Sequence, residues 1–141
     1  MAFVGTYEHT LDAKGRLVLP SKFRSHFDDA AYLSPHDGCI ALWTPDGFQE
    51  MVESLLEGAR EGDTEPRVLR GVASISEEVR PDAQGRIMMP SRLQAFANLD
   101  REIVICGVIQ RIEIWNASSW EAMADELDES VEIAFQQGSG I

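Results

Sequence analysis

Two short stretches of this sequence place a carboxylate, a glycine and an arginine in the same order and at the same spacing. One reads DAKGR from Asp12 to Arg16, and the other reads DAQGR from Asp82 to Arg86. An aspartate at the start of a tight turn accepts hydrogen bonds from the backbone N–H groups that follow it, and glycine tolerates the positive φ that the turn requires. The arginine then offers a planar fork of N–H donors, which matches the O6 and N7 atoms of guanine. The pattern therefore indicates an arginine presented by a turn.

The same pattern also has a purely structural interpretation. Most charged side chains near turns are solvated or loosely paired, so Arg16 and Arg86 would then pair with Asp12 and Asp82 and do nothing more. A single motif of this kind is weak. On these residues alone, both interpretations stay open.

The motif belongs to a longer internal repeat. Residues 12–23 align with residues 82–93 at an offset of 70, and six of the twelve positions are identical. At an offset of 72 the matching residues are Ile40, Trp43, Phe48 and Met51 with Ile112, Trp115, Trp120 and Met123. A unit of about 60 residues buries too little apolar surface to be stable alone. We therefore expect the two copies to pack as one pseudo-symmetric domain.

Each copy begins with the signals of a β-hairpin and a short helix. Residues 4–11 read as a strand that enters the turn, and residues 16–19 return as a second strand that Pro20 ends. Ser21 is placed to be the N-cap of a short helix, as is Ser91 in the second copy.

Further strands and an amphipathic helix follow the hairpin. Strands are expected at 39–43 and at 103–115, the second of them broken near Gly107. Thr44 is placed to cap a helix that has Pro45 at its first position. The apolar residues of that helix fall at i, i+3, i+4, i+7 and i+8, which predicts a single apolar face.

The second copy ends in a comparable helix. Ser118 and Glu121 have the spacing of a capping box. One apolar face is predicted for this helix, formed by Trp120, Met123, Ala124, Leu127 and Val131. We expect this face to be buried within the fold and the acidic residues to be solvated.

These elements predict an α+β, β-rich fold of two halves. The first half spans residues 3–58, with its core at 5–47, and the second spans 73–133, with its core at 76–119. A polar linker at 59–72 joins them, in which Val68 and Leu69 start a connecting helix, and residues 134–141 form a flexible tail.

The charge of the chain is strongly segregated. The formal net charge is −12, from 12 basic and 24 acidic residues, which by itself argues against a nucleic-acid partner. The segment from Asp12 to His26, however, has a local net charge of +3. The segment from Ala117 to Ile141 has six acidic residues and no Lys or Arg. Such segregation is typical of an acidic protein with one anion-binding face.

Several function classes are disfavoured by what the sequence lacks. It has no apolar run long enough to span a membrane and no signal peptide, so we expect a cytoplasmic protein. Cys39 and Cys106 lie in apolar runs and are expected to be reduced core residues. His9, His26 and His36 share no metal-ligand spacing. No metal, cofactor or small-molecule substrate is therefore expected.

With its doubled D-x-x-G-R motif and the Pro20 and Pro90 that follow, the chain resembles the MraZ family. The resemblance implies two AbrB-like swapped-hairpin halves in one double-psi-barrel-like domain, with an amphipathic helix after each half. It further implies a nucleoid-associated transcriptional regulator that assembles into a closed homo-oligomeric ring. Its expected target is double-stranded DNA, as G-rich direct repeats in the promoter of a cell-division and cell-wall gene cluster that it autorepresses.

The resemblance assigns DNA contacts to matching residues. Arg16 would read bases, with Asp12 and Gly15, like Asp82 and Gly85, shaping the turns. The other expected contacts are Lys14, Lys22 and Arg24 in the first copy and Arg86 and Arg92 in the second. Gln84 replaces the lysine of the first motif, which leaves the second turn poorer in positive charge.

Two other function classes compete with this interpretation. Paired aspartates suggest an aspartic protease, but the D-[TS]-G motif is absent and each adjacent arginine would keep its aspartate ionised. An enzyme is therefore not expected. An AbrB-like antitoxin or protein-interaction module, with the acidic C-terminal segment wrapped around a partner, is the alternative.

Overall fold

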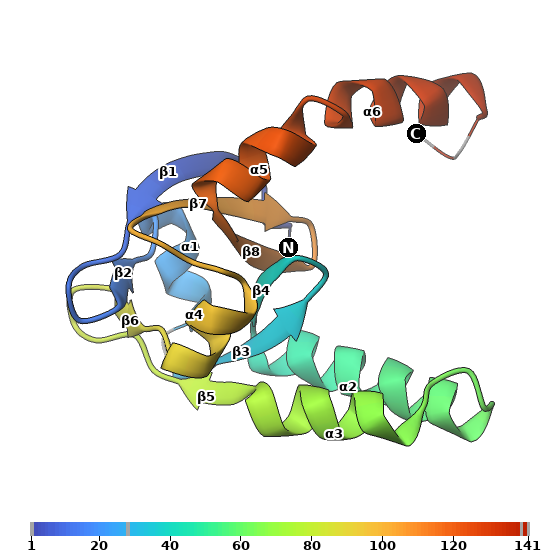
Figure 1. Cartoon of the computed structure of the whole chain (residues 1–141), viewed down its shortest axis with the longest axis horizontal. Coiled ribbons are helices and arrows are strands. Elements are labelled where there is room, and N and C mark those ends of the chain that lie inside the picture. The colour runs from blue at the N-terminus through green and yellow to red at the C-terminus, as the bar shows by residue number, and fades with distance from the viewer. Residues whose placement is uncertain (1, 28, 139, 141) are drawn as a thin grey trace.

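A computed structural model describes residues 2–27, 29–138 and 140 (Figure 1). Its main layer is an antiparallel sheet of six strands. In spatial order these are β1 (Thr6–Thr10), β7 (Glu102–Val108), β8 (Arg111–Asn116), β4 (Cys39–Trp43), β3 (Ala31–His36) and β5 (Glu77–Val79). A second sheet pairs β2 (Arg16–Val18) with β6 (Arg86–Met88).

In the described residues, seven helical segments connect or cover these strands. They are α1 (Ser21–Arg24), the 3-10 turn η1 (Ser25–Phe27), α2 (Pro45–Arg60), α3 (Pro66–Ile75), α4 (Ser91–Phe96), α5 (Ala117–Ala124) and α6 (Leu127–Gln136). Among the residues that the structure describes, no helix is long and apolar enough to cross a membrane.

The duplication in the sequence appears as a pseudo-two-fold axis in the fold. The equivalent strands of the two halves are β1 and β5, β3 and β7, and β4 and β8. Each pair lies at equal distances from the centre of the large sheet, on opposite sides. The axis passes through the cross-strand pair Ala41 and Glu113 in the large sheet and through Leu17 and Ile87 in the small one. The predicted α+β fold of two related halves is confirmed.

The predicted local hairpin is wrong beyond its turn. The turn closes as expected, with the Asp12 N–H bonded to the Arg16 carbonyl at 2.9 Å. After it, β1 pairs with β7 and β2 pairs with β6, so each strand of the hairpin finds its partner in the other half. The strands separate because Leu17 and Ile87 bury against each other and the main core, which a flat local hairpin would leave exposed. This exchange is the swapped arrangement that the resemblance implies.

The main core fills the space between the large sheet, the small sheet and the short helices. Leu17, Leu19, Ile87 and Met89 enter it from the small sheet, and all are at most 1% exposed. Both cysteines are free and buried on the other side of the large sheet, near Trp115. Burial raises the pKa of the Cys106 thiol to about 12, and it raises the pKa of Cys39 as well. The prediction of reduced core cysteines is confirmed.

Of the three predictions made for helix N-termini, the Thr44 cap is confirmed and the other two are wrong. Thr44 accepts a hydrogen bond from the Gly47 N–H and Pro45 begins α2, as predicted. Ser21 and Ser91 are not N-caps, because the chain turns at the preceding prolines and these serines are already the first helical residues. The capping box at Ser118 and Glu121 does not form, because the Asn116 side chain accepts from the Ser118 and Ser119 N–H groups and starts α5 two residues earlier.

The C-terminal helix was predicted as one element and is two. It is interrupted at Asp125 and Glu126, between α5 and α6. Trp120 and Met123 of α5 pack against the sheet, but Leu127, Val131 and Phe135 of α6 are 39–53% exposed. The expectation that this apolar face is buried within the fold is therefore wrong for α6. The helix also extends into the predicted tail at 134–141, of which residues 139 and 141 lie outside the described chain.

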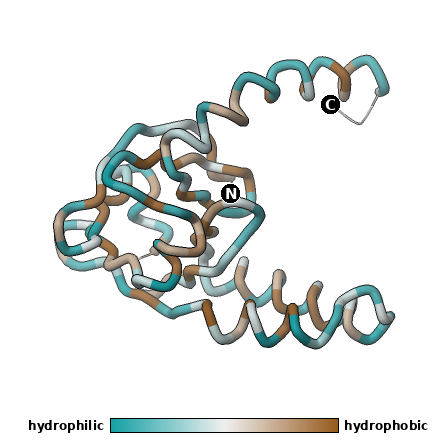
Figure 2. The backbone as a smooth tube through the Cα atoms, in the orientation of Figure 1, coloured by the Kyte–Doolittle hydropathy of each residue, from teal (hydrophilic) through white to brown (hydrophobic). Residues whose placement is uncertain are grey.

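Two helical arms leave the sheet on the side away from the small sheet (Figure 1). One is the antiparallel pair α2 and α3, which occupies most of the segment predicted as a linker at 59–72. The other is α5 followed by α6. Figure 2 shows apolar positions along the facing sides of α2 and α3 and scattered along the isolated α6. The break expected near Gly107 is confirmed: β7 ends at Val108 and β8 begins at Arg111, and Ile109 between them has a φ of 62°.

The contribution of close packing at a turn glycine can be measured by comparison with a second glycine that has a similar φ and open surroundings. Gly85 has a φ of 78° and lies under the Arg24 side chain, whereas Gly62 has a φ of 80° and no atom within 4 Å of an added Cβ. We expect Gly62→Ala to lower the free energy of unfolding by about 1 kcal/mol, the cost of the backbone conformation. Gly85→Ala should cost about 1–3 kcal/mol more because Arg24 must also move. Denaturant unfolding measures both, and equal losses would contradict the close packing of Arg24.

Candidate nucleic-acid interface

The small sheet and its two turns form one end of the molecule (Figure 1). In the first turn, the Asp12 Oδ1 accepts from the backbone N–H groups of Lys14 and Arg16, each at 2.9 Å. In the second, the Asp82 Oδ1 accepts from those of Gln84 and Arg86 at the same distance. Both turns are thus held by the aspartate that the sequence analysis assigned to this role.

Each aspartate also fixes the arginine that follows the turn. The Nε of Arg16 donates to the Asp12 Oδ2 at 2.7 Å, and the Nε of Arg86 donates to the Asp82 Oδ2 at 2.7 Å. The side chains of the two arginines remain 29% and 33% exposed. Within the described chain, no hydrogen bond engages their terminal Nη groups. The ion pairs therefore orient each guanidinium and leave the outer fork open for a ligand.

The pKa values of the two turn aspartates are shifted in the same direction. The pKa of Asp12 is held below its usual range, chiefly by the hydrogen bond from the Arg16 backbone N–H and also by the Arg16 side chain. The pKa of Asp82 is lowered in the same way by Arg86. Both carboxylates are thus ionised well below neutral pH, and the arginines stay paired throughout the physiological range.

The open face of the small sheet carries two arginines and two apolar side chains. Arg16 pairs across the strands with Met88, and Val18 pairs with Arg86, whereas Leu17 and Ile87 between them point into the core. Val18 is 37% exposed and Met88 is 51% exposed. The sequence analysis treated these two residues as ordinary strand residues. The signal that could have found them is the period-2 alternation with the buried Leu17 and Leu19.

Arg24 follows the first turn in the sequence, but its side chain lies at the second turn. Its Nε donates to the Leu19 carbonyl at 2.9 Å, and its side chain covers Gly85. Gln94, the equivalent residue of the other half, donates to the Met89 carbonyl at 2.8 Å and covers Gly15. The exchange of strands between halves thus brings Arg24 beside Gln84, where the second motif lacks a lysine.

The remaining predicted basic contacts lie around this face. Lys14 is exposed in the first turn. Lys22 is on α1, with its Nζ 5.4 Å from the centre of the Tyr7 ring, and Arg92 is exposed on α4. Arg101 lines a shallow pocket with Lys14 beside the first turn, and the sequence analysis missed it because it is distant in sequence.

One group of metal-binding residue types meets elsewhere in the fold. The sequence analysis placed no cysteine in a Cys/His cluster, but the sheet brings ligand atoms of His36, Cys39 and Glu113 within 4.8 Å of one another. The Glu113 carboxylate already accepts from the guanidinium of Arg111 at 2.8 Å and from the Trp115 Nε1 at 3.0 Å. A cation would be repelled by Arg111 and would have to displace these donors, so the arrangement fits a buried polar network better than a metal centre.

Comparison with known proteins identifies the family. The family model described as "MraZ protein, putative antitoxin-like" matches residues 2–71 and again residues 74–138. The chain belongs to the MraZ family. A relative from Cutibacterium acnes named "Transcriptional regulator MraZ" is 36% identical over 129 residues, which cover 91% of each chain. Another of that name, from Lachnoclostridium phytofermentans, is 38% identical over 131 residues, covering 90% of this chain and 91% of the relative. These names support a transcriptional regulator.

The ion pairs at the two MraZ turns can be tested by titration. A carboxylate whose folded pKa is lowered adds stability above the unfolded pKa, and that contribution is lost as pH falls through the folded pKa. We expect NMR titration of the carboxyl carbons to give Asp12 and Asp82 pKa values below the usual Asp range. Their contribution to the free energy of unfolding should therefore be kept until the pH falls to those lowered values. In Arg16→Ala, the pKa of Asp12 should rise while that of Asp82 stays unchanged as an internal control. A parent-like Asp12 value in Arg16→Ala would contradict the pairing.

Proposed function

We propose that this MraZ-family protein is a sequence-specific transcriptional regulator that reads double-stranded DNA through the small sheet of β2 and β6. The observation that carries the proposal is the pair of arginines on its open face, each oriented through Nε by an aspartate and each with an open outer fork. Because the duplication places both open forks on the exposed face of the small sheet, the two arginines can contact one DNA duplex together.

A two-stranded antiparallel ribbon fits the major groove of DNA. In that position Arg16 and Arg86 donate two bonds each to guanine O6 and N7. The exposed Val18 and Met88 beside them are suited to contact thymine methyl groups. The basic residues around the face contact phosphates and set the register, namely Lys14, Lys22, Arg24, Arg92 and Arg101.

The distribution of charge supports this orientation. The acidic residues of α5 and α6 lie on an arm that leaves the sheet on the side away from β2 and β6 (Figure 1). DNA held at the small sheet is therefore distant from the most acidic surface. The net charge of −12 then disfavours contact between DNA and the acidic surfaces of the protein, and not contact through the small sheet.

One ribbon reaches only a few base pairs, so useful affinity requires several subunits on adjacent repeats. The family resemblance supplies the finer proposal: a homo-oligomeric ring, cytoplasmic and nucleoid-associated, that binds G-rich direct repeats in the promoter of a cell-division and cell-wall gene cluster. Autorepression of that cluster is the proposed outcome. No enzymatic activity is proposed.

A second candidate function has one observation in its favour. The apolar residues of the acidic α6 are exposed, as they would be in a protein-binding segment of an antitoxin. A gene for a small toxin beside this one would favour that function. A neighbouring methyltransferase gene followed by division and wall genes would favour the regulator.

Fluorescence anisotropy tests the main proposal directly. The titration compares the DNA upstream of the protein's own gene with a scrambled duplex of equal composition, at several salt concentrations. Arg16→Ala should lose about 1–3 kcal/mol per engaged ribbon and relax the preference for guanine. Lys22→Ala should weaken both duplexes alike and reduce the salt slope by about 1. Parent-like binding of the upstream duplex by Arg16→Ala would show that Arg16 does not read bases.

A sharper variant separates the turn from the arginine. In Asp12→Asn the amide oxygen still accepts both backbone hydrogen bonds, but the amide nitrogen cannot accept from the Arg16 Nε. We expect the ratio of specific to scrambled affinity to fall about tenfold, or about 1.4 kcal/mol, with little change in the unfolding midpoint. Scrambled binding should strengthen slightly because a negative charge is lost. An unchanged ratio would mean that the ion pair does not prepare Arg16 for DNA.

A further inference from the structure

The open face of the small sheet is nearly symmetric, and this limits what it can read. Arg16 and Arg86 lie on one diagonal of the face, and Val18 and Met88 lie on the other, with the pseudo-two-fold axis between them. A ribbon with an exact two-fold axis would bind a DNA site equally well after a rotation of 180°, because the rotation exchanges identical side chains. A regulator that prefers direct repeats to inverted ones must distinguish these two orientations. At least one base-facing side chain must therefore break the symmetry.

Neither the surrounding cations nor the two arginines can supply this direction. Phosphates are alike on both strands, so contacts to them position the protein but carry no sequence information directly. Arg16 and Arg86 are equivalent, since each donates from Nε to its aspartate at 2.7 Å and their side chains are 29% and 33% exposed. The two ends of the open face therefore differ in the remaining pair, Val18 and Met88.

Val18 and Met88 differ in stiffness as well as in length. Valine is branched at Cβ and restricted at χ1, so the two methyl groups of Val18 are held in one place above the strand. Methionine is unbranched and has three rotatable bonds, so its thioether adapts to different neighbours. Met88 is also the more exposed of the two, at 51% against 37% for Val18. Val18 is thus suited to select one base edge, and Met88 is suited to tolerate several.

The surroundings of Val18 also favour a fixed contact with DNA. Val18 lines a hollow of about 350 Å³ together with Lys22 and Arg24. The Lys22 Nζ lies 5.4 Å from the centre of the Tyr7 ring, and the Arg24 Nε donates to the Leu19 carbonyl at 2.9 Å. A phosphate held by these two cations would set the distance between Val18 and the base edges, because phosphate contacts fix the register of a protein on DNA.

We propose that Val18 selects a thymine methyl group at one end of each DNA repeat, and that Met88 accepts any base pair at the other end. This role of Val18 rests on the proposed function, in which the small sheet lies in the major groove. Thymine presents its C5-methyl group there, and apolar side chains recognise it. The two ends of the face then make different contacts, which gives each repeat a direction.

The register of the sheet places the selected thymine. Val18 is directly opposite Arg86. Residues opposite each other in an antiparallel pair have Cβ atoms about 4.5–5.5 Å apart. Base pairs along one strand are about 3.4 Å apart. The thymine that Val18 contacts therefore belongs to a base pair next to the guanine that Arg86 contacts.

Replacing thymine by deoxyuridine tests this selection, because deoxyuridine lacks only the methyl group. The probe is a set of duplexes with one repeat from the DNA upstream of the gene, each with a single thymine of either strand replaced. Fluorescence anisotropy measures the affinity of the protein for each duplex. We expect one replacement to weaken binding by the parent about fourfold, the effect of removing one buried methyl-sized group, and the others to have little effect.

Variants identify the side chain that detects the methyl group. Val18→Ala should bind the thymine and deoxyuridine duplexes equally well, whereas Met88→Ala should keep the parent's response. The control is Val4→Ala, at an apolar residue that is 51% exposed and lies outside this face, which should also respond as the parent does. Circular dichroism confirms that each variant is folded. A response that survives in Val18→Ala, or that is lost equally in Met88→Ala, would overturn the role of Val18.

A symmetric variant tests the direction itself. Met88→Val places the same side chain at both ends of the face, so it should bind direct and inverted repeats equally well while keeping the response to deoxyuridine. The parent should lose about fourfold in affinity for each repeat that is inverted. A Met88→Val protein that keeps the parent's preference for direct repeats would show that another residue sets the direction.

The outcomes also separate this role from the proposed function. Specific binding of the upstream duplex by the parent, with no thymine that responds to deoxyuridine, would overturn the role of Val18 and leave the proposed function standing. Equal binding of the upstream and scrambled duplexes by the parent would remove the proposed function, and the role of Val18 with it.

Discussion

The pairing of β2 with β6 is the interaction on which the rest of this structure depends. A three-residue strand has no stability of its own, and the carbonyl of each turn's glycine finds its hydrogen-bond donor in the other half. The Gly15 carbonyl accepts from the Met89 N–H at 2.8 Å, and the Gly85 carbonyl accepts from the Leu19 N–H at 2.9 Å. Each turn is thus completed by the other half. The two arginines are consequently held in a fixed diagonal relation, which separate halves would not maintain.

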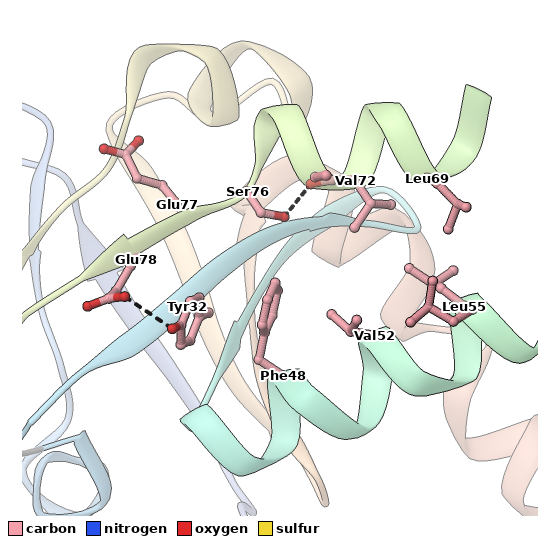
Figure 3. Close-up of a pocket in the computed structure, with 11 residues that line it drawn as sticks. Tyr32, Phe48, Val52, Leu55, Leu69, Val72, Ser76, Glu77 and Glu78 are labelled. Atoms are coloured by element: carbon pink, nitrogen blue, oxygen red, sulfur yellow. Dashed lines mark hydrogen bonds between the residues drawn. The ribbon is translucent and has the colours of Figure 1, made fainter. Parts of the chain in front are cut away.

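The two halves are alike in their strands and turns, and they differ in the helices that follow the sheet. After the first half, α2 is joined by α3, and the two helices make a groove. After the second, α5 ends at Asp125 and α6 continues without a neighbour in its own chain (Figure 1). A symmetric duplication would present two identical arms and favour a symmetric dimer. The arms instead diverge: the first has an apolar groove between α2 and α3 (Figure 3), and the second ends in a helix with exposed apolar side chains.

Signals that act within a few residues could be predicted from the sequence. The Asp12 and Asp82 turns, the Thr44 cap and the duplication all follow from neighbouring side chains and backbone preferences. The partner of β2 could not be predicted, because alternation of Leu17, Val18 and Leu19 suits a local hairpin and a swapped pair equally well. The break between α5 and α6 has no glycine or proline to mark it. The meeting of His36, Cys39 and Glu113 depends on the register of three strands, which no local pattern encodes.

Position in the fold also changes the interpretation of the Gln84 substitution. Considered along the sequence, the second motif has lost a cation relative to Lys14. In the fold, each turn is covered by a residue from the other half, and these covering residues are Arg24 over Gly85 and Gln94 over Gly15. Counting only motif and covering residues, each turn therefore has one cation and one amide: Lys14 with Gln94 at the first, and Arg24 with Gln84 at the second. Arg101 and Asp100 also lie beside Lys14 at the first turn. The lysine missing from the second motif is thus replaced in space by an arginine of the other half, so the Gln84 substitution alone gives no reason to rank Arg86 below Arg16.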